Sequence, residues 1–200
     1  MPRSFVRFAG CGSKRQPGPH ASKTMKEERR DMAKMLIVVR HGKAQTRSAD
    51  RADFERELTG AGKRALKAWL PKSRRLLEGE GACTFELWAS PAARAMQTAE
   101  LVSKAWGKNL PGFPKRAQPV DALWEGDLDG VMAAFERTDA DAVVVCGHNP
   151  YIEILCSQLT GCDITFATGG VAALRLDDLP GRPRARLLWF VQGPESRNWK

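Results

Sequence analysis

The stretch MLIVVRHGKAQ, residues 35–45, places four aliphatic residues in a row directly before Arg40, His41 and Gly42. A short run rich in Val and Ile that ends at a glycine is typical of a strand buried on both faces of a parallel sheet. Ligands of such sheets bind at the carboxyl ends of the strands. The sequence therefore predicts that Arg40 and His41 lie at a binding or catalytic site.

A buried strand followed directly by a helix occurs twice more along the chain. The second unit is TFELWAS with SPAARAMQTAELVSKAW, where we expect Ser90 to cap the helix and Pro91 to begin it. The third unit is AVVVCGHNPYIEILCSQLTG, with Asn149 as the expected cap and Pro150 as the first helical residue. Three such units predict a parallel sheet with helices packed against it.

The remaining segments complete this architecture. LTGAGKRALKAWL predicts a helix capped by Thr59, which Pro71 should kink or end. LWEGDLDGVMAAFER reads as a loop leading into a short helix. GGVAALRLDD and RARLLWFVQ, joined through LPGRPR, predict two antiparallel strands. The predicted fold class is therefore α/β, a three-layer α/β/α sandwich with a mostly parallel central sheet and an antiparallel C-terminal strand.

Length and composition predict one folded domain, residues 35–200. The chain has 200 residues, of which 42% are hydrophobic, enough for one core. No apolar run approaches the length of a membrane span, so we expect a soluble protein with no membrane partner. The net charge of +9 would favour nucleic acid or an anionic surface if it were spread over the domain.

The excess positive charge lies mostly in residues 1–34, which carry nine Lys and Arg against three acidic residues. We therefore expect no nucleic acid partner for the domain. The 1–34 extension has no sustained periodicity and is rich in Gly, Pro and Ser, which predicts disorder. A weak targeting segment and a misassigned start, with Met35 as the true first residue, are alternatives that the sequence leaves open.

The five cysteines indicate the redox compartment. They are odd in number and lack CxxC spacing, in a chain long enough to need no disulfide. We therefore expect a cytoplasmic protein. Cys146 and His148 have no second pair of ligands nearby in the sequence, so no metal and no cofactor are predicted.

The three strand-to-helix junctions together supply four basic or titratable groups: Arg40, His41, Arg94 and His148. Arg94 falls in the first turn of its helix, where free backbone N–H groups already favour an anion. No acidic cluster accompanies these groups. Two arginines and two histidines at one sheet edge therefore favour a dianionic phosphoryl group as the ligand.

At these residues the chain resembles the histidine phosphatase superfamily, the phosphoglycerate-mutase-like enzymes. VVRHGKA resembles the nucleophile motif of that family, SPAARAMQTAE its second-arginine segment and VCGHNP its second-histidine segment. The three motifs occur in the family's order and span about residues 35–177. RELTGAG, together with the short spacing between Arg94 and His148, is similar to the SixA-like branch, the phosphohistidine phosphatases.

The resemblance implies that His41 is the nucleophile and forms a phosphohistidine intermediate that water hydrolyses. Arg40, Arg94 and His148 would bind the phosphoryl oxygens, with His148 alternatively acting as a charged donor. Many family members also supply a carboxylic acid that protonates the leaving oxygen. Glu125 is the best candidate here, with Asp121 behind it, although both also fit solvated loop residues.

The sequence therefore predicts a cytoplasmic, metal-independent phosphatase. The leading substrate is a protein that carries phosphohistidine. The alternatives are a small-molecule phosphomonoesterase of the same superfamily, a non-catalytic protein that binds phosphate at this site, and a nucleic-acid-binding module formed by the extension.

Overall fold

The computed structural model describes residues 34–77, 80–177 and 184–194, all of which belong to one compact unit, Met32–Lys200. Predictions for the N-terminal extension up to residue 33, and for the turn between the two C-terminal strands, lie outside the described residues. Within these ranges, no helix combines the length and apolar character needed to cross a membrane.

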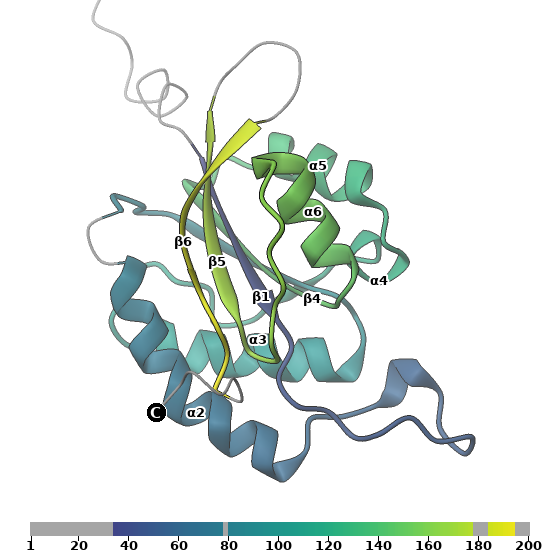
Figure 1. The fold of residues 1–200 in the computed structure, drawn as a ribbon. Helices are drawn as coiled ribbons and strands as arrows, with labels where there is room; N and C mark the ends of the chain where they lie inside the picture. The colour runs from purple at the N-terminus through teal and green to yellow at the C-terminus, as the bar shows by residue number, and fades with distance from the viewer. Residues whose placement is uncertain (1–33, 78–79, 178–183, 195–200) are drawn as a thin grey trace, which may run out of the picture. The chain divides into compact units, whose positions relative to one another are not determined.

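One six-stranded sheet forms the centre of the described chain (Figure 1). Its strands are β1 (Met35–Arg40), β2 (Phe85–Ala89), β3 (Gln118–Pro119), β4 (Ala142–Gly147), β5 (Val171–Asp177) and β6 (Arg184–Val191). Their order in the sheet is β3-β2-β4-β1-β5-β6. The pairings among β1 to β4 are parallel, and β5 pairs antiparallel with both β1 and β6. The predicted mostly parallel sheet with antiparallel C-terminal pairing is thus confirmed.

β1 lies inside the sheet, between β4 and β5. Ile37 and Val39 pack into the core on one face, and Leu36 and Val38 pack into the core on the other. A strand covered on both faces needs apolar residues at every position, which explains the uninterrupted aliphatic run.

Four helices cover the sheet and have these bounds: α2 (Gly60–Arg74), α3 (Ala93–Trp106), α5 (Leu128–Arg137) and α6 (Tyr151–Thr160). Leu66 of α2 and Trp106 of α3 share a core cluster with Ile37 and Val39. The buried residues of α5 and α6, such as Leu155, belong to the opposite cluster. Figure 1 shows the two pairs of helices on opposite sides of the sheet, as the three-layer prediction requires.

Of the two effects predicted for Pro71, a kink or an end of the first helix, the end does not occur. α2 continues through Pro71 to Arg74 and is followed by a 3-10 turn, η2 (Arg75–Leu77). Ser73 and Leu77 beyond the proline are buried, so packing of this end against the domain outweighs the lost backbone hydrogen bond.

The predicted caps of two helices are also wrong. α3 begins at Ala93 and α6 at Tyr151, and neither N-cap residue makes a side-chain cap. Ser90 Oγ lies instead 2.7 Å from His148 Nε2. Asn149 Nδ2 donates to Glu153 Oε1 and to the Phe166 carbonyl. Ser90 Oγ also accepts from the Ala92 N–H at 3.4 Å, and Glu153 lies in the first turn of α6, so both side chains link a helix start to the region around the strand ends.

Three short elements that the sequence did not predict lie between the main ones. They are the 3-10 turn η1 (Asp53–Glu55), the strand β3 and the one-turn helix α4 (Ala122–Glu125). α4 overlaps the segment that we expected to be a loop, and no element was predicted at β3. Elements of two to four residues are too short to carry a hydrophobic period, so sequence patterns do not reveal them.

Candidate active site

Sheet register brings the two histidines together. Arg40 at the end of β1 is paired with Gly147 at the end of β4, and the His41 N–H donates to the Gly147 carbonyl at 3.1 Å. His148 follows Gly147 directly. The ring centroids of His41 and His148 are consequently 5.1 Å apart.

Arg94 reaches the same place from the first turn of α3. Its Nε donates toward His41 Nε2 at 3.3 Å, and its side chain is only 5% exposed. Thr98, one turn further along α3, accepts from the Gly42 N–H at 3.1 Å and donates to the Arg94 carbonyl at 2.7 Å. Hydrogen bonds thus tie the start of α3 to the chain just after β1. We call Arg40, His41, Arg94 and His148 the Arg/His cluster.

The hydrogen bonds of His41 define its tautomer. Nδ1 lies 2.7 Å from the Gly42 carbonyl oxygen, which can only accept a hydrogen bond, so Nδ1 carries the proton. In the neutral ring Nε2 then carries the lone pair, which accepts the hydrogen bond from Arg94. Burial, followed by the charges of Arg94 and Arg40, lowers the pKa of His41 to about 4. The ring is therefore neutral, with an unprotonated Nε2, at neutral pH.

His148 is also neutral in this structure. Burial comes first among the causes that lower its pKa to about 3, followed by the neighbouring His41 and Arg94. The expectation of a charged His148 donor therefore does not hold for the free site. Its Nδ1 and the Nε of Arg40 are buried and have no hydrogen-bond partner among the described residues. Buried groups of this kind favour a ligand that satisfies them.

Arg40 is hydrogen-bonded to the segment that precedes β5. Its guanidinium donates to the Phe166 carbonyl. The Phe166 N–H in turn donates to Glu153 Oε1 at 2.8 Å, and Asn149 donates to both the same carboxylate and the same carbonyl. Glu153 of α6 therefore fixes the backbone on which Arg40 rests. Its carboxylate is already occupied by two donors.

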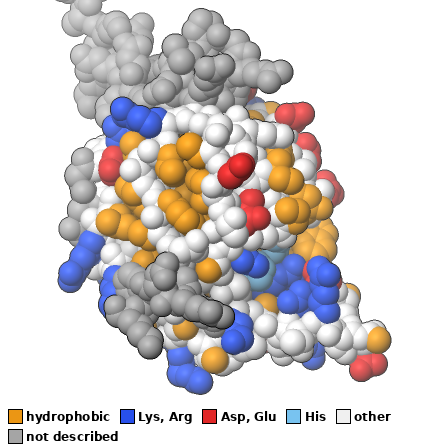
Figure 2. All heavy atoms as spheres, in the orientation of Figure 1, with side chains coloured by type: hydrophobic (Ala, Val, Ile, Leu, Met, Phe, Trp, Pro, Cys, Tyr) orange, Lys and Arg blue, Asp and Glu red, His pale blue; other side chains and the backbone are white. Residues whose placement is uncertain are grey.

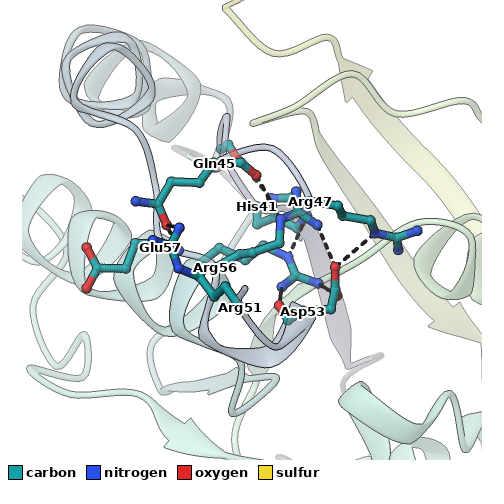
Figure 3. Close-up of polar contacts among 9 residues, drawn as sticks. His41, Gln45, Arg47, Arg51, Asp53, Arg56 and Glu57 are labelled. Atoms are coloured by element: carbon teal, nitrogen blue, oxygen red, sulfur yellow. Dashed lines mark hydrogen bonds and ion pairs between the residues drawn. The ribbon is translucent and has the colours of Figure 1, made fainter. Parts of the chain in front are cut away.

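Asp53 is the site residue that the sequence analysis missed. Its Oδ2 lies 2.9 Å from an Arg94 terminal nitrogen, and Arg94 also donates to the Asp53 carbonyl at 2.6 Å. Its Oδ1 forms ion pairs with Arg56 at 2.7 Å and with Arg47 at 3.0 Å. Figure 3 shows this carboxylate surrounded by the arginines. A carboxylate three residues before an arginine, in a loop rich in arginine, was the only signal in the sequence.

These ion pairs keep Asp53 ionised. Burial alone would raise the pKa of Asp53, but the hydrogen bonds from Arg56 and Arg47, with the charges of Arg94 and Arg56, hold it well below its usual range. The side chain is 33% exposed, so Asp53 lies where the site opens to solvent. It serves as a counter-ion for Arg94.

The predicted acids lie on α4 and directly before it. Glu125 at the end of α4 and Asp121 before it are both exposed. In the part of the chain that the structure describes, their side chains form no hydrogen bond or ion pair. The side chain that α4 contributes to the site is Trp124, whose ring centroid lies 5.6 Å from that of His148, with Arg94 Cζ 5.6 Å above the ring.

A metal site was not predicted, and residues 34–77, 80–177 and 184–194 contain no group of three or more His, Cys, Asp or Glu side chains arranged to hold an ion. Cys146, considered with His148 in the sequence, is fully buried in β4 as a free thiol, and burial raises its pKa. The thiol is therefore protonated and packs as an apolar residue.

Comparison with known proteins gives one family match. The model of the histidine phosphatase superfamily (branch 1) matches residues 36–128. The structure of the protein histidine phosphatase SixA complexed with tungstate superposes with a TM-score of 0.62 at 26% identity, covering 80% of this chain and 97% of that one. Over residues 36–128 the chain is therefore similar to the histidine phosphatase superfamily, and its fold is similar to that of SixA.

Two further structures support the fold assignment. The candidate phosphohistidine phosphatase SixA from Agrobacterium tumefaciens has a TM-score of 0.62 at 22% identity and covers 80% of this chain and 97% of its own. A candidate α-ribazole-5′-P phosphatase from Escherichia coli has a TM-score of 0.53 at 17% identity, covering 78% of this chain and 94% of its own. The comparison with curated proteins found no significant match.

Proposed function

We propose that this protein is a phosphatase that acts through a phosphohistidine intermediate on His41 and removes phosphoryl groups from phosphohistidine in proteins. His41 meets the first requirement of a nucleophile, because its Nε2 is unprotonated and next to Arg94, and the residue is partly exposed. The SixA relative was solved with tungstate, a tetrahedral oxyanion like phosphate. A site of the same fold with two arginines suits such an anion.

In the proposed reaction, His41 Nε2 attacks phosphorus while the bond to the leaving group breaks. Arg40, Arg94 and His148 donate hydrogen bonds to the phosphoryl oxygens, and the two guanidinium charges neutralise the developing negative charge. The Gly42 carbonyl holds the Nδ1 proton throughout and keeps the ring oriented. Water then attacks phosphorus, His41 leaves as the neutral ring, and inorganic phosphate is released. The arginines supply the charge that a metal supplies elsewhere, so we propose that turnover needs no metal.

The state of the nearby carboxylates is the observation that favours phosphohistidine as substrate. Asp53 is ionised and bound by three arginines, and Glu153 accepts two hydrogen bonds behind Arg40. Asp53 therefore carries no proton for a leaving alkoxide, and Glu153 is engaged behind Arg40. An alkyl phosphate depends on such a proton, a contribution of about 10²- to 10⁴-fold, whereas an imidazole can leave from a labile P–N bond already protonated.

A leaving-group series tests this proposal. Values of kcat/KM are measured for a phosphohistidine peptide, p-nitrophenyl phosphate and glycerol phosphate. We expect phosphohistidine and the aryl phosphate to be turned over well, and glycerol phosphate at least about 100-fold less efficiently. Glu125→Gln should change none of these values by more than about threefold, since Glu125 is exposed.

Two outcomes contradict the proposal. If glycerol phosphate is the best substrate and Glu125→Gln lowers its turnover about 100-fold or more, the protein is a small-molecule phosphomonoesterase with Glu125 as its acid. If no phosphorylated compound is turned over while phosphate binds, the site is a phosphate-binding site without catalysis.

We further propose that residues 35–200 carry the activity and that the protein is cytoplasmic. The four described cysteines, Cys83, Cys146, Cys156 and Cys162, are free thiols, which suits a reducing compartment. A chain that starts at Met35 should retain the kcat/KM of the full chain. A loss of activity on this truncation would assign the extension a part in the site, and localisation of a tagged full chain tests the compartment.

A further inference from the structure

Two aromatic rings stand at the edge of the Arg/His cluster, and the proposed mechanism does not use them. Phe54 of η1 and Trp124 of α4 pack edge to face, with ring centroids 5.2 Å apart. They come from segments 70 residues apart in the sequence, so the contact is a property of the tertiary structure. We call these two residues the aromatic pair.

The aromatic pair contacts the groups that bind the phosphoryl oxygens. Trp124 meets His148 edge to face at 5.6 Å between ring centroids, and the Arg94 guanidinium lies over its ring. Phe54 directly follows Asp53, whose carboxylate binds the same Arg94. A group bonded to a phosphoryl held by Arg94 and His148 would therefore lie within reach of these rings.

The exposure of the pair marks it as more than core packing. Phe54 is a large hydrophobic residue that is 41% exposed. The large aliphatic residues of β1, in contrast, are fully buried in the core. Trp124 is partly exposed, on a one-turn helix whose buried anchor is the neighbouring Leu123. Figure 2 shows hydrophobic side chains bordering the histidine and arginine patch on this face of the molecule. Two adjacent rings that remain partly open to solvent beside a polar site offer an apolar corner to a ligand, in which one ring presents its face and the other its edge.

We propose that Phe54 and Trp124 form a platform for a flat, aromatic leaving group, and that the group it accepts is the imidazole ring of the phosphohistidine substrate. In-line transfer places the leaving group on the far side of phosphorus from His41 Nε2, toward the open side of the site. The platform would stack on that ring while the P–N bond breaks. This inference rests on the proposed function and names the part of the site that selects its substrate.

The test compares leaving groups with and without a ring. Values of kcat/KM for a phosphohistidine peptide, p-nitrophenyl phosphate and acetyl phosphate are measured for the full-length protein and for Trp124→Ala and Phe54→Ala. Acetyl phosphate has a reactive leaving group but no ring. We expect each variant to lose about 3- to 10-fold on the two aromatic substrates, the range of one aromatic contact, and less than about twofold on acetyl phosphate.

Two controls separate the platform from a structural role. Trp124→Phe keeps a ring at the same position and should restore most of the lost kcat/KM on the aromatic substrates. Leu76→Ala removes an apolar side chain of similar exposure, 39%, from η2, and should change no kcat/KM value. An equal fall on all three substrates would overturn the platform and assign Trp124 to holding Arg94. Unchanged values on all three would overturn it as well.

The proposed function and the platform can fail separately. The wild-type preference between phosphohistidine and glycerol phosphate judges the function alone. The ratio of p-nitrophenyl phosphate to acetyl phosphate in Trp124→Ala judges the platform alone, because neither compound contains histidine. A protein that prefers alkyl phosphates and still shows this ratio change would keep the platform and lose the phosphohistidine assignment.

Discussion

Arg40 and His41 leave β1 with backbone bonds on both sides, to Gly170 and Gly147, whereas Asp53 and Phe54 project from a 3-10 turn that contains no buried residue. The first region belongs to the centre of the sheet and the second to a surface loop. We refer to Arg40, His41 and His148 as the strand-end group, and to Asp53, Phe54 and Trp124 as the loop group.

The two groups divide the work of the proposed enzyme. The strand-end group supplies the nucleophile and donors that must keep their positions to within fractions of an ångström. The loop group contacts Arg94 from the outside, where it sets the local charge and the shape of the entrance. We therefore expect the chemistry to depend on the sheet and substrate selection to depend on the surface elements. The following predictions test that division.

The largest effect should come from the strand-end group. His41→Ala should lower turnover by at least about 10⁴-fold, as expected for loss of a nucleophile. The free energy of unfolding should change by less than about 1 kcal/mol, since His41 lies past the end of the strand and is only partly buried. Rapidly quenched wild-type enzyme should carry acid-labile phosphate on His41, which mass spectrometry detects. Phosphate on any other residue would refute the assignment.

The next prediction concerns protonation of the same group. The folded-state pKa of His41 is about 4 and that of His148 about 3. Neither ring should therefore titrate near the ordinary value of about 6.5, a difference of at least about 300-fold in proton affinity. NMR of the imidazole nitrogens, with assignment from His41→Ala and His148→Ala, measures this directly. A midpoint above about pH 6 for either ring would contradict the burial argument.

The same shifts predict how stability depends on pH. The unfolded chain binds protons at these histidines below about pH 6.5, while the folded protein does not until about pH 4 or lower. The unfolded state therefore binds more protons across this interval, and the free energy of unfolding should fall as pH falls through it. Asp53 acts at lower pH, where protonation of its carboxylate removes its ion pairs. Urea unfolding at several pH values separates the two ranges.

Arg94 connects the two groups, because it faces His41 on one side and Asp53 on the other. Arg94→Ala should lower kcat/KM by about 10²- to 10³-fold, the range for removing one donor from developing negative charge. Arg94→Lys keeps the charge but loses the paired N–H donors of the guanidinium. It should therefore recover only part of the lost kcat/KM. Full recovery with lysine would show that charge alone is required here.

The smallest effect is expected from the loop group. Asp53→Asn removes a negative charge that competes with phosphate for Arg94, so inorganic phosphate should inhibit about 3- to 10-fold more strongly. Asp50→Asn makes the same change of charge in the same loop, at an exposed residue away from Arg94, and serves as the control. Weaker inhibition in Asp53→Asn would mean that Asp53 chiefly holds Arg94 in place.

The same division explains what the sequence could predict. β1 and β4 are apolar at nearly every position because both faces are covered, so their ends, and with them Arg40, His41 and His148, could be located. Arg94 was found because it follows a recognisable strand-to-helix junction. The order of the strands in the sheet could not be predicted from the sequence. The three strand-to-helix units limited it to a few arrangements.

The loop group could not be found in this way. Asp53 lies in an arginine-rich loop with no period, and its partner Arg94 is 41 residues away. Trp124 lies on a four-residue helix next to Glu125, and the sequence offered no reason to choose the ring over the carboxylate. Ser90 and Asn149 were assigned to caps because local rules favour them there, yet contacts distant in sequence engage both side chains.

The position of β1 between two strands has a consequence for how the protein behaves on warming. The amide hydrogens of Arg40 and His41 can exchange with solvent only when the sheet itself opens, whereas η1 and α4 can open locally at a smaller free-energy difference. On heating, η1 and α4 should therefore unfold locally at a lower temperature than the end of β1 that carries His41. Just below its melting temperature the enzyme would still hydrolyse phosphoryl groups but would discriminate poorly between their carriers.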